Sequence, residues 1–257
     1  MTRPYPLDSK VAVLIDADNT PYEQIKQIFD ESARYGRAII KRAYGDWSKP
    51  NLQKWLDVCN DNAIKSVQLN RYTKGKNSTD MGMFVEAMDM IHKKEVDTFI
   101  LVSSDSDFTH LAIRIREAGF QVVGIGRRTT PAPFVKSCDQ FVHLEPLLED
   151  SQASNGKSES IAKSKKSFTE KQLEAQQTGR DLLIRAARQA MDESGIVSGA
   201  ELSAILRRIE PSFNFINYGV RKLSDFVALY PDIIKPTGEK SGLDPLYQVS
   251  DKALKGN

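Results

Sequence analysis

Carboxylate side chains gather in two short segments of the chain, Asp16-Ala17-Asp18-Asn19 and Asp105-Ser106-Asp107. Grouped carboxylates are the ligands that hard cations such as Mg²⁺ prefer, so each segment could contribute to a metal site. The same residue types also suit the start of a helix, where Asp caps the first turn and the helix dipole stabilises its charge. Either segment taken alone leaves both interpretations open.

Alternating strands and helices in the first half of the chain would position these acids. Apolar runs such as residues 11–15 and 99–102 are typical of parallel strands that are buried on both faces. Repeated strand–helix units predict right-handed crossovers and a three-layer α/β domain with a parallel sheet. We expect strands at 11–15, 38–45, 64–69, 99–103, 121–125 and 141–144, and helices at 21–35, 50–61, 79–94, 108–118 and 131–138.

The acids follow the strands at the carboxyl edge of this sheet, where ligands bind in open α/β folds. Asp16 and Asp18 follow the first strand, and Asp105 and Asp107 follow the fourth. Asp80 opens the helix after the third strand. If the first and fourth strands are neighbours, both acid pairs face one crevice. Carboxylates crowded there repel one another unless a cation or shared protons offset the charge, which favours a metal site over separate helix caps.

Three segments carry a resemblance to a known family. Leu14-Ile15-Asp16-Ala17-Asp18-Asn19, Ser78-Thr79-Asp80 and Val102-Ser103-Ser104-Asp105-Ser106-Asp107-Phe108 resemble the acidic motifs of the NYN domain, the LabA-type branch of the PIN-like nucleases. The similarity covers residues 10–147, and we expect the domain itself to span residues 1–148. The resemblance implies a PIN-like fold and a ribonuclease activity that depends on one or two Mg²⁺ or Mn²⁺ ions.

The resemblance also implies a role for each matched residue. Asp16 corresponds to the ligand after the first strand, and Asn19 to its polar partner. Asp80 corresponds to the central acid, and Asp105 and Asp107 to the paired acids. The implied catalytic residues are Asp16, Asn19, Asp80, Asp105 and Asp107, and the four aspartates among them are the implied metal ligands. Asp18 lies at a position that is less strictly acidic in the family, so its role is left open.

Basic loops surround the predicted acidic edge, where an anionic substrate needs positive charge. The loop of residues 70–77 leads directly to Asp80, and another basic loop follows the fifth strand. Such side chains contact the phosphate backbone in many RNA-binding proteins, although loop charge is also commonly just solvated. Tyr72 and Tyr44 are aromatic residues that could stack on bases. The expected RNA contacts in this half are Arg71, Lys74, Lys76, Arg127 and Arg128.

Residues 149–178 differ in composition from the rest of the chain. Serine and lysine alternate there with few large apolar residues, a composition that cannot bury a core. We therefore predict a flexible linker, with a helical lead-in at residues 168–177. The basic run at residues 163–166 could contact RNA, although such runs usually stay solvated.

Helical periodicity returns from Gly179 and indicates a small winged-helix-like domain over residues 179–257. Helices are expected at 179–195, 198–208 and 218–229, the second opened by the capping-box spacing Ser198-Gly199-Ala200-Glu201. Two short strands at 233–235 and 246–249 complete the fold. The segment resembles the OST-HTH or LOTUS domain, through Gly199-Ala200-Glu201-Leu202, Pro211-Ser212-Phe213, Tyr218-Gly219 and Lys222-Leu223-Ser224-Asp225-Phe226.

The OST-HTH/LOTUS resemblance implies that this domain binds RNA, single-stranded or structured and in some members G-rich, and that it can bind proteins. The candidate RNA contacts are Tyr218, Arg221 and Lys222. We expect Phe213, Phe215, Leu223 and Phe226 to belong to the core instead.

Composition excludes several other classes of protein. The 257 residues include 36 Lys+Arg and 34 Asp+Glu. The resulting net charge of +2 does not by itself indicate a class of binding partner. No apolar run approaches the roughly 20 residues of a membrane span, and the N-terminus lacks the apolar segment of a signal peptide. Two distant cysteines and three scattered histidines give little support to a zinc site. These features favour a protein of the reducing cytoplasm.

Three functions stay open at the level of the sequence. The first is a metal-dependent ribonuclease with an RNA-binding module. The second is a non-catalytic RNA or protein adaptor with a degenerate nuclease fold, against which the complete acid set argues. The third is a phosphatase of the haloacid dehalogenase class, because Asp16-Ala17-Asp18-Asn19-Thr20 fits that family's nucleophile turn. That alternative lacks a cap domain and leaves Asp80 without a role.

Overall fold

The structure is a computed structural model that describes residues 9–69, 78–145, 165–242 and 244–250, with residues 78–81 and 165–175 described by their backbone alone. It divides into two compact units, residues 2–153 and 154–257. Nowhere in the described ranges is a helix both long and apolar enough to cross a membrane.

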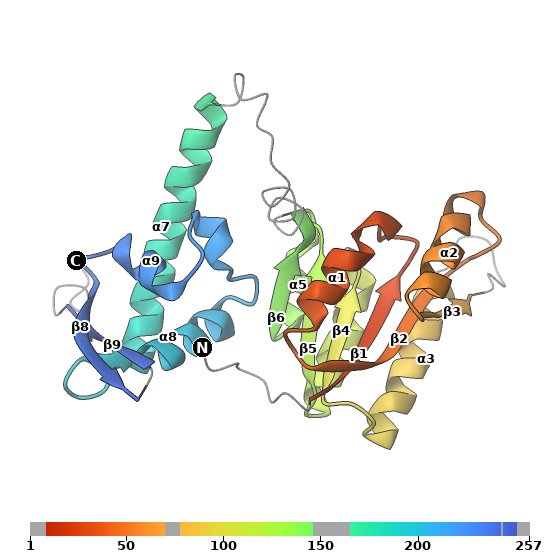
Figure 1. Ribbon diagram of the computed structural model, residues 1–257, viewed down its shortest axis with the longest axis horizontal. Helices are drawn as coiled ribbons and strands as arrows, with labels where there is room; N and C mark the ends of the chain where they lie inside the picture. Colours follow the sequence, from red (N-terminus) through yellow and green to blue (C-terminus); the bar gives the residue numbers. More distant parts are fainter. Residues whose placement is uncertain (1–8, 70–77, 146–164, 243, 251–257) are drawn as a thin grey trace. The chain divides into compact units, whose positions relative to one another are not determined.

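The first unit is built on a six-stranded sheet in which all neighbouring strands are parallel (Figure 1). The strand order is β3-β2-β1-β4-β5-β6. The strands are β1 (Lys10–Asp16), β2 (Arg37–Gly45), β3 (Lys65–Gln68), β4 (Thr98–Val102), β5 (Gln121–Gly126) and β6 (Gln140–His143). The predicted parallel sheet is confirmed, and so is the expected edge strand, which is β6.

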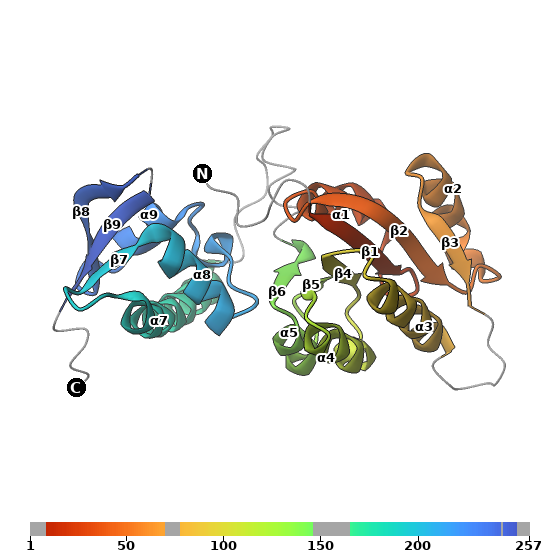
Figure 2. The ribbon, with the colours of Figure 1, turned by 90° about the horizontal axis from the view of Figure 1, so that it is seen from below.

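Helices cover both faces of this sheet, so the predicted three-layer α/β architecture is confirmed (Figure 2). On one face lie α1 (Ile25–Ser32) and α2 (Gln53–Asp61), and on the other lie α3 (Ser78–Lys93), α4 (Thr109–Glu117) and α5 (Ala132–Ser137). Three helices are preceded by short 3₁₀ turns, a common form of helix terminus. These turns are η1 (Tyr22–Gln24), η2 (Pro50–Leu52) and η3 (Ser106–Phe108).

Strands β1 and β4 are neighbours, and this adjacency decides what the acidic segments can do. From β1 the chain continues outward to β2 and β3, and it then returns to place β4 on the other side of β1. Such a reversal of strand order is a topological switch point, where the loops on either side diverge and leave room for a ligand. Register pairs Ile15 with Val102, so the segments after both strands begin side by side.

The second unit combines helices with a three-stranded antiparallel sheet of order β7-β9-β8. Its elements are α7 (Lys165–Ala190), β7 (Ile196–Ser198), α8 (Gly199–Ile209), η4 (Phe215–Tyr218), α9 (Leu223–Ala228), β8 (Ile234–Ser241) and β9 (Asp244–Val249). Strand β7 was not predicted, because so short a segment shows no measurable periodicity. The capping box is present, with Ser198 Oγ accepting from the Glu201 N–H at 3.2 Å.

Two glycines explain where the predicted helices of this unit were wrong. The third helix begins at Leu223 and not at 218, because Gly219 adopts a left-handed φ of 77° that ends the preceding 3₁₀ turn. The first helix runs straight through Gly179. A Cβ atom there would lie 2.5 Å from Tyr230 Oη, so this glycine allows close packing and does not start the helix. Helix α7 begins at Lys165, so it takes up residues 165–178 of the predicted linker and confirms the helical lead-in predicted at 168–177. Residues 149–164 lie outside the described ranges.

Candidate active site

The carboxylate of Asp16 is the centre of the candidate site. Asp16 is the last residue of β1 and is fully buried. Ser103, which directly follows β4, donates a hydrogen bond from Oγ to Asp16 Oδ2 at 2.7 Å. Asn19 donates from Nδ2 to the same oxygen at 2.7 Å. The adjacency of β1 and β4 thus brings together residues that are far apart in the sequence.

The other oxygen of Asp16 has no such partner. Within the described part of the chain, Asp16 Oδ1 is buried and accepts no hydrogen bond. Burial raises the pKa of Asp16, the hydrogen bonds from Asn19 and Ser103 oppose that shift, and the charge of Asp18 adds to it. A desolvated carboxylate with one uncompensated oxygen is a position where a bound cation would be stabilising.

Asp105 is linked to Asp16 through Ser103. The Asp105 N–H donates to Ser103 Oγ at 3.0 Å, while the Ser103 hydroxyl donates to Asp16. Asp105 also caps η3, since its Oδ1 accepts from the Asp107 N–H at 3.0 Å. The helix-cap interpretation therefore applies to one oxygen of Asp105. We call Asp16, Asn19, Ser103 and Asp105 the acidic site.

The two remaining predicted acids, Asp107 and Asp80, are not among these four residues. Asp107 is exposed in the first turn of η3. Asp80 lies in the first turn of α3, the helix that follows β3, but its side chain is outside the described residues. Among the side chains that are described, no group of three or more His, Cys, Asp or Glu is arranged to hold a metal ion. The acidic site is therefore the part of the predicted metal centre that the structure brings together.

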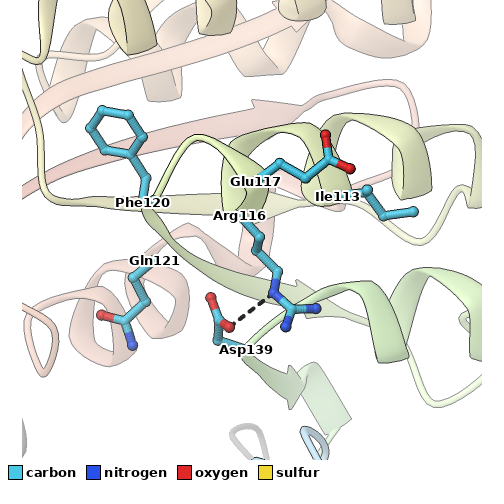
Figure 3. A pocket seen from close by; sticks show the side chains of 7 residues that line it. Ile113, Arg116, Glu117, Phe120, Gln121 and Asp139 are labelled. Atoms are coloured by element: carbon cyan, nitrogen blue, oxygen red, sulfur yellow. Dashed lines mark ion pairs between the residues drawn. The ribbon is translucent and has the colours of Figure 1, made fainter.

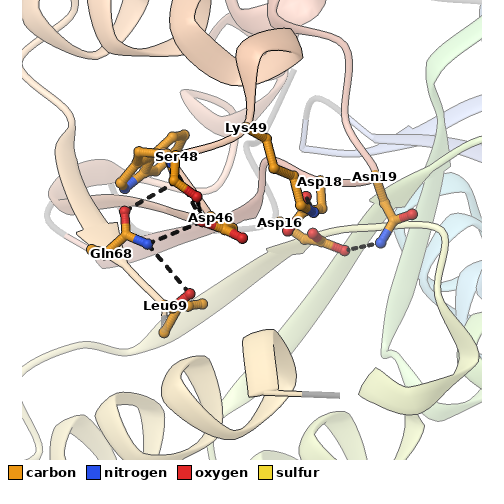
Figure 4. A network of polar contacts seen from close by, with 9 residues as sticks. Asp16, Asp18, Asn19, Asp46, Ser48, Lys49, Gln68 and Leu69 are labelled. Carbon is orange, nitrogen blue, oxygen red and sulfur yellow. Dashed lines mark hydrogen bonds and ion pairs between the residues drawn. The ribbon is translucent and has the colours of Figure 1, made fainter. Parts of the chain in front are cut away.

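Asp18, whose role the sequence left open, forms an ion pair with Lys49 (Figure 4). Lys49 belongs to the loop between β2 and η2, and sequence reasoning missed it because no motif marks that loop. Sequence reasoning also missed the part played by Ser103, although its position directly after an apolar strand and before two acidic residues was an available signal.

The loop that carries Lys49 is held by side-chain hydrogen bonds (Figure 4). Asp46 Oδ1 accepts from Ser48 Oγ at 2.6 Å and from Gln68 Nε2 at 3.3 Å. These hydrogen bonds, with that from Ser48 contributing most, lower the pKa of Asp46. Gln68 in turn accepts from the Trp47 N–H at 3.1 Å. The end of β3 thereby anchors the loop after β2.

Arg127 and Arg128, two predicted RNA contacts, are exposed in the loop after β5. The Arg127 N–H donates to Ser104 Oγ at 2.9 Å, which ties this loop to the segment after β4. The Arg128 N–H donates to the carboxylate of Glu145 at 3.0 Å. The other contacts predicted for this unit, Arg71, Lys74 and Lys76, lie outside the described residues, as does Tyr72.

The expectation that Tyr44 could stack on bases is wrong. Tyr44 is fully buried, and its hydroxyl donates to Glu86 Oε2 on α3 at 2.7 Å. Arg42 forms an ion pair with the same carboxylate oxygen. Burial, together with the Glu86 carboxylate, raises the pKa of Tyr44. These residues fasten α3 to β2, because strand alternation places the Tyr44 side chain on the face that α3 covers.

In the C-terminal unit the candidate RNA contacts are of two kinds. Arg221 and Lys222 are exposed, and Lys222 Nζ lies 3.6 Å from Asp225 Oδ1. Tyr218 is half-buried, with its ring centroid 5.0 Å from that of Phe226, and burial raises its pKa to about 12. The Tyr218 ring thus contributes to the aromatic core of this unit.

A depression of about 590 Å³ lies at the amino edge of the sheet, where β5 begins (Figure 3). Arg116 and Asp139 pair across it, with Nε and Oδ1 3.0 Å apart. The acidic site lies at the carboxyl edge, so the depression is not part of it. Its lining consists of Ile113, Arg116, Glu117, Gly119, Phe120, Gln121 and Asp139.

Comparison with known proteins shows that the chain matches two families. A family model of the NYN domain matches residues 10–145. A family model of the OST-HTH/LOTUS domain matches residues 174–244. A comparison with curated proteins found no significant match.

Two examples of similar solved structures are the following. A protein of unknown function from Vibrio parahaemolyticus has 21% identity and a TM-score of 0.46, over 54% of this chain and 94% of that one. A putative UDP-N-acetylglucosamine 2-epimerase from Listeria monocytogenes has 9% identity and a TM-score of 0.34, over 86% of this chain and 71% of that one. On the family matches, the chain belongs to the NYN domain family of PIN-like nuclease folds and carries an OST-HTH/LOTUS domain after it.

Proposed function

We propose that this protein is a metal-dependent ribonuclease that hydrolyses RNA phosphodiester bonds at the acidic site. The observation that carries this proposal is Asp16 Oδ1, a buried carboxylate oxygen without a hydrogen-bond donor among the described residues. It lies at the switch point of the sheet, the edge where ligands bind in such folds. The NYN domain has a nuclease-type fold, which favours phosphodiester chemistry over other uses of a cation. The same assignment disfavours the phosphatase alternative.

The residues that would hold Mg²⁺ or Mn²⁺ are Asp16, Asp80, Asp105 and Asp107. Asp16 fits because hard cations take carboxylate oxygens and because a cation would offset its desolvation. Asp105 uses Oδ1 for its cap, which leaves its second oxygen for a ligand. The chemistry that such an ion supplies when bound is activation of a water and stabilisation of the leaving oxygen.

Asn19 and Ser103 orient the carboxylate of Asp16. Both donate to Oδ2, so Oδ1 is the oxygen that remains for a cation. Both hydrogen bonds also favour the ionised form of Asp16 against the desolvation that raises its pKa. Their role is thus to keep one oxygen occupied and the group charged. Because Ser103 also accepts from the Asp105 N–H, it holds the two acidic segments in register.

The C-terminal domain supplies the proposed second RNA-binding surface, with Arg221 and Lys222 as its exposed cations. Joining it to the nuclease domain raises the local concentration of RNA without a new contact. Single-stranded or structured RNA, including G-rich RNA, is the proposed ligand, and a protein partner is an alternative one.

We also infer a cytoplasmic setting, supported by Cys59 and Cys138, which are both free and buried. Burial raises the pKa of Cys59 to about 11 and that of Cys138 to about 12. Neither thiol is therefore a reactive thiolate near neutral pH.

The test is cleavage of labelled single-stranded and structured RNA in Mn²⁺, Mg²⁺ or EDTA, with Asp105→Asn beside the wild type. This near-isosteric change removes one charge. We expect cleavage that needs metal and is lost in the variant. Folded wild type that binds RNA but cleaves it with neither metal would favour the adaptor alternative, which the capping role of Asp105 also fits.

A further inference from the structure

Lys49 places a positive charge beside the acidic site, and the proposed function so far gives it no role. Its ammonium pairs with Asp18, two residues beyond Asp16 in the same turn (Figure 4). The side chains of Lys49 and Asp18 are 29% and 15% exposed. A pair that is partly withdrawn from solvent is screened less than a surface pair, so its charges act strongly on their surroundings.

The loop that carries Lys49 is fixed by its own hydrogen bonds. The Lys49 N–H donates to the Asp46 carbonyl at 3.0 Å, which closes a turn. Asp46 Oδ1 accepts from the Ser48 N–H at 3.3 Å and from its Oγ at 2.6 Å. Pro50 then starts η2 and restricts the backbone on the other side of Lys49. The backbone at Lys49 is thus held in one place, and the ion pair with Asp18 orders its long side chain.

The negative charges of Asp16 and Asp18 would be stabilised by a cation beside them. Asp16 and Asp18 repel one another, and the charge of Asp18 raises the pKa of Asp16. A phosphodiester is also an anion, so a site lined by acids alone would repel it. A lysine ammonium has three donors, and Asp18 takes one of them. The Lys49 side chain is only partly buried, so we infer that its other donors are available to a ligand.

We propose that Lys49 is the cation that binds the nonbridging oxygens of the scissile phosphodiester, and that Asp18 holds Lys49 in place instead of ligating the metal. This inference rests on the proposed ribonuclease function. It gives a reason for an acid at position 18, although the charge of Asp18 raises the pKa of Asp16. The competing explanation is an ion pair that merely fastens the loop after β2 to the turn after β1.

The experiment measures single-turnover cleavage of labelled single-stranded RNA and Mn²⁺ binding by calorimetry, both with the full chain. The variants are Lys49→Met, Lys49→Gln, Asp18→Asn and Asp16→Asn, with Lys54→Met as a charge-matched control. Lys54 is an exposed residue of α2 outside the acidic site. Thermal unfolding shows that each variant is folded, and Lys49→Gln replaces Lys49→Met if the apolar side chain disturbs the loop.

We expect Lys49→Met to slow cleavage by about 10²-fold, as for the loss of one preorganised donor to a developing charge. Mn²⁺ affinity should not fall in Lys49→Met or Asp18→Asn, whereas Asp16→Asn should lose it. Asp18→Asn should also slow cleavage, and combining it with Lys49→Met should add no further loss, because both changes act through one ammonium. Lys54→Met should cleave like the wild type.

Two results would overturn the assignment. One is a loss of Mn²⁺ binding in Asp18→Asn as large as that in Asp16→Asn, which would make Asp18 a ligand. The other is cleavage at the wild-type rate by folded Lys49→Met. If the folded wild type cleaves RNA in neither Mn²⁺ nor Mg²⁺, the ribonuclease proposal is overturned separately. RNA affinity measured in Ca²⁺ then tests whether Lys49 contacts the phosphate. Weaker binding by Lys49→Met than by Lys54→Met supports this contact, and equal affinities contradict it.

Discussion

The acidic site and the candidate RNA-binding face of the C-terminal domain are built in opposite ways. Asp16 is fully buried, and its hydrogen-bond donor Ser103 lies 87 residues away in the sequence. Arg221 and Lys222 are exposed, and Lys222 pairs with Asp225 three residues along. The first site depends on strand adjacency, while the second depends on local sequence.

This difference predicts how strongly each region responds to change. Exposed ion pairs contribute about 0–1 kcal/mol, because water screens them and the side chains stay mobile. The energy of a buried carboxylate depends far more on its surroundings, since an unmet charge in a low-dielectric site costs several kcal/mol. Substitutions in the acidic site should therefore abolish RNA cleavage or metal binding. Substitutions on the C-terminal face should reduce RNA affinity only in part.

The largest effect is expected for Asp16→Asn. Loss of the buried carboxylate should reduce RNA cleavage by about 10³-fold or more, because the proposed metal loses a fully buried ligand. Gel-based cleavage assays in Mn²⁺ measure this loss. Asp89→Asn, at an exposed position of α3, is the matched control and should keep wild-type activity. Equal cleavage by the two variants would remove Asp16 from the reaction.

The next effect concerns the core of the C-terminal unit. Phe226 is fully buried, with its ring against those of Phe213, Phe215, Tyr218 and Tyr230. Phe226→Ala should destabilise this unit by about 3–5 kcal/mol, since it leaves a cavity among aromatic rings. Calorimetry should show the loss in the unfolding transition of this unit alone. Leu229→Ala, at a partly exposed position, should change stability by less than about 1 kcal/mol.

Metal should stabilise the nuclease domain through Asp16. At a free Mn²⁺ concentration of 100 times Kd, binding to the folded state alone adds about 2.7 kcal/mol to the free energy of unfolding. EDTA should reverse this gain, and Asp16→Asn should not show it. Denaturant unfolding with and without Mn²⁺ makes the measurement. An equal gain in the variant would place the metal elsewhere.

A smaller effect is expected for Arg221→Ala and Lys222→Ala. Each should weaken RNA binding a few-fold and lower the slope of log affinity against log salt by about 0.7, the value for one phosphate contact on a single strand. Binding at several salt concentrations provides the slope. Arg185→Ala, an exposed position of α7, is the control for charge alone. A slope that falls as much in the control would show that these contacts are not local.

The smallest effect is a pH dependence of stability in EDTA. The folded-state pKa of Asp16 is raised, so the folded protein binds the proton more tightly than the unfolded chain does. The contribution of Asp16 to stability should therefore fall as the pH rises above the ordinary Asp pKa of about 3.9. Asp16→Asn should gain stability over the wild type near pH 7, and the difference should shrink toward pH 4. A constant difference would contradict the raised pKa.

Local patterns in the sequence were sufficient for much of the fold. Residues 11–15 form part of β1, because a continuous apolar run suits a strand that is covered on both faces. Ser198 caps α8 in the predicted way, since a capping box needs only residues within one turn. The acidic motifs likewise marked Asp16 and Asp105, whose positions after apolar runs placed them at the carboxyl edge.

Other features depend on atoms that only the tertiary structure brings together. Gly179 seemed to start a helix, but its lack of a side chain allows the close approach of Tyr230, which is distant in the sequence. Tyr44 seemed available to RNA, but α3 covers it and Glu86 binds its hydroxyl. Neither outcome has a local signal, because the partner comes from a separate element.

The sequence by itself determined the types of side chain, the strands that carry them and the edge where they gather. The tertiary structure decided which oxygen of Asp16 is left without a partner and which cation meets Asp18. The physical reason is that a hydrogen bond or ion pair requires its atoms to meet within a few ångströms. Ser103 and Lys49 reach the turn after β1 from 87 and 31 residues away, distances that only the order of the strands brings to contact.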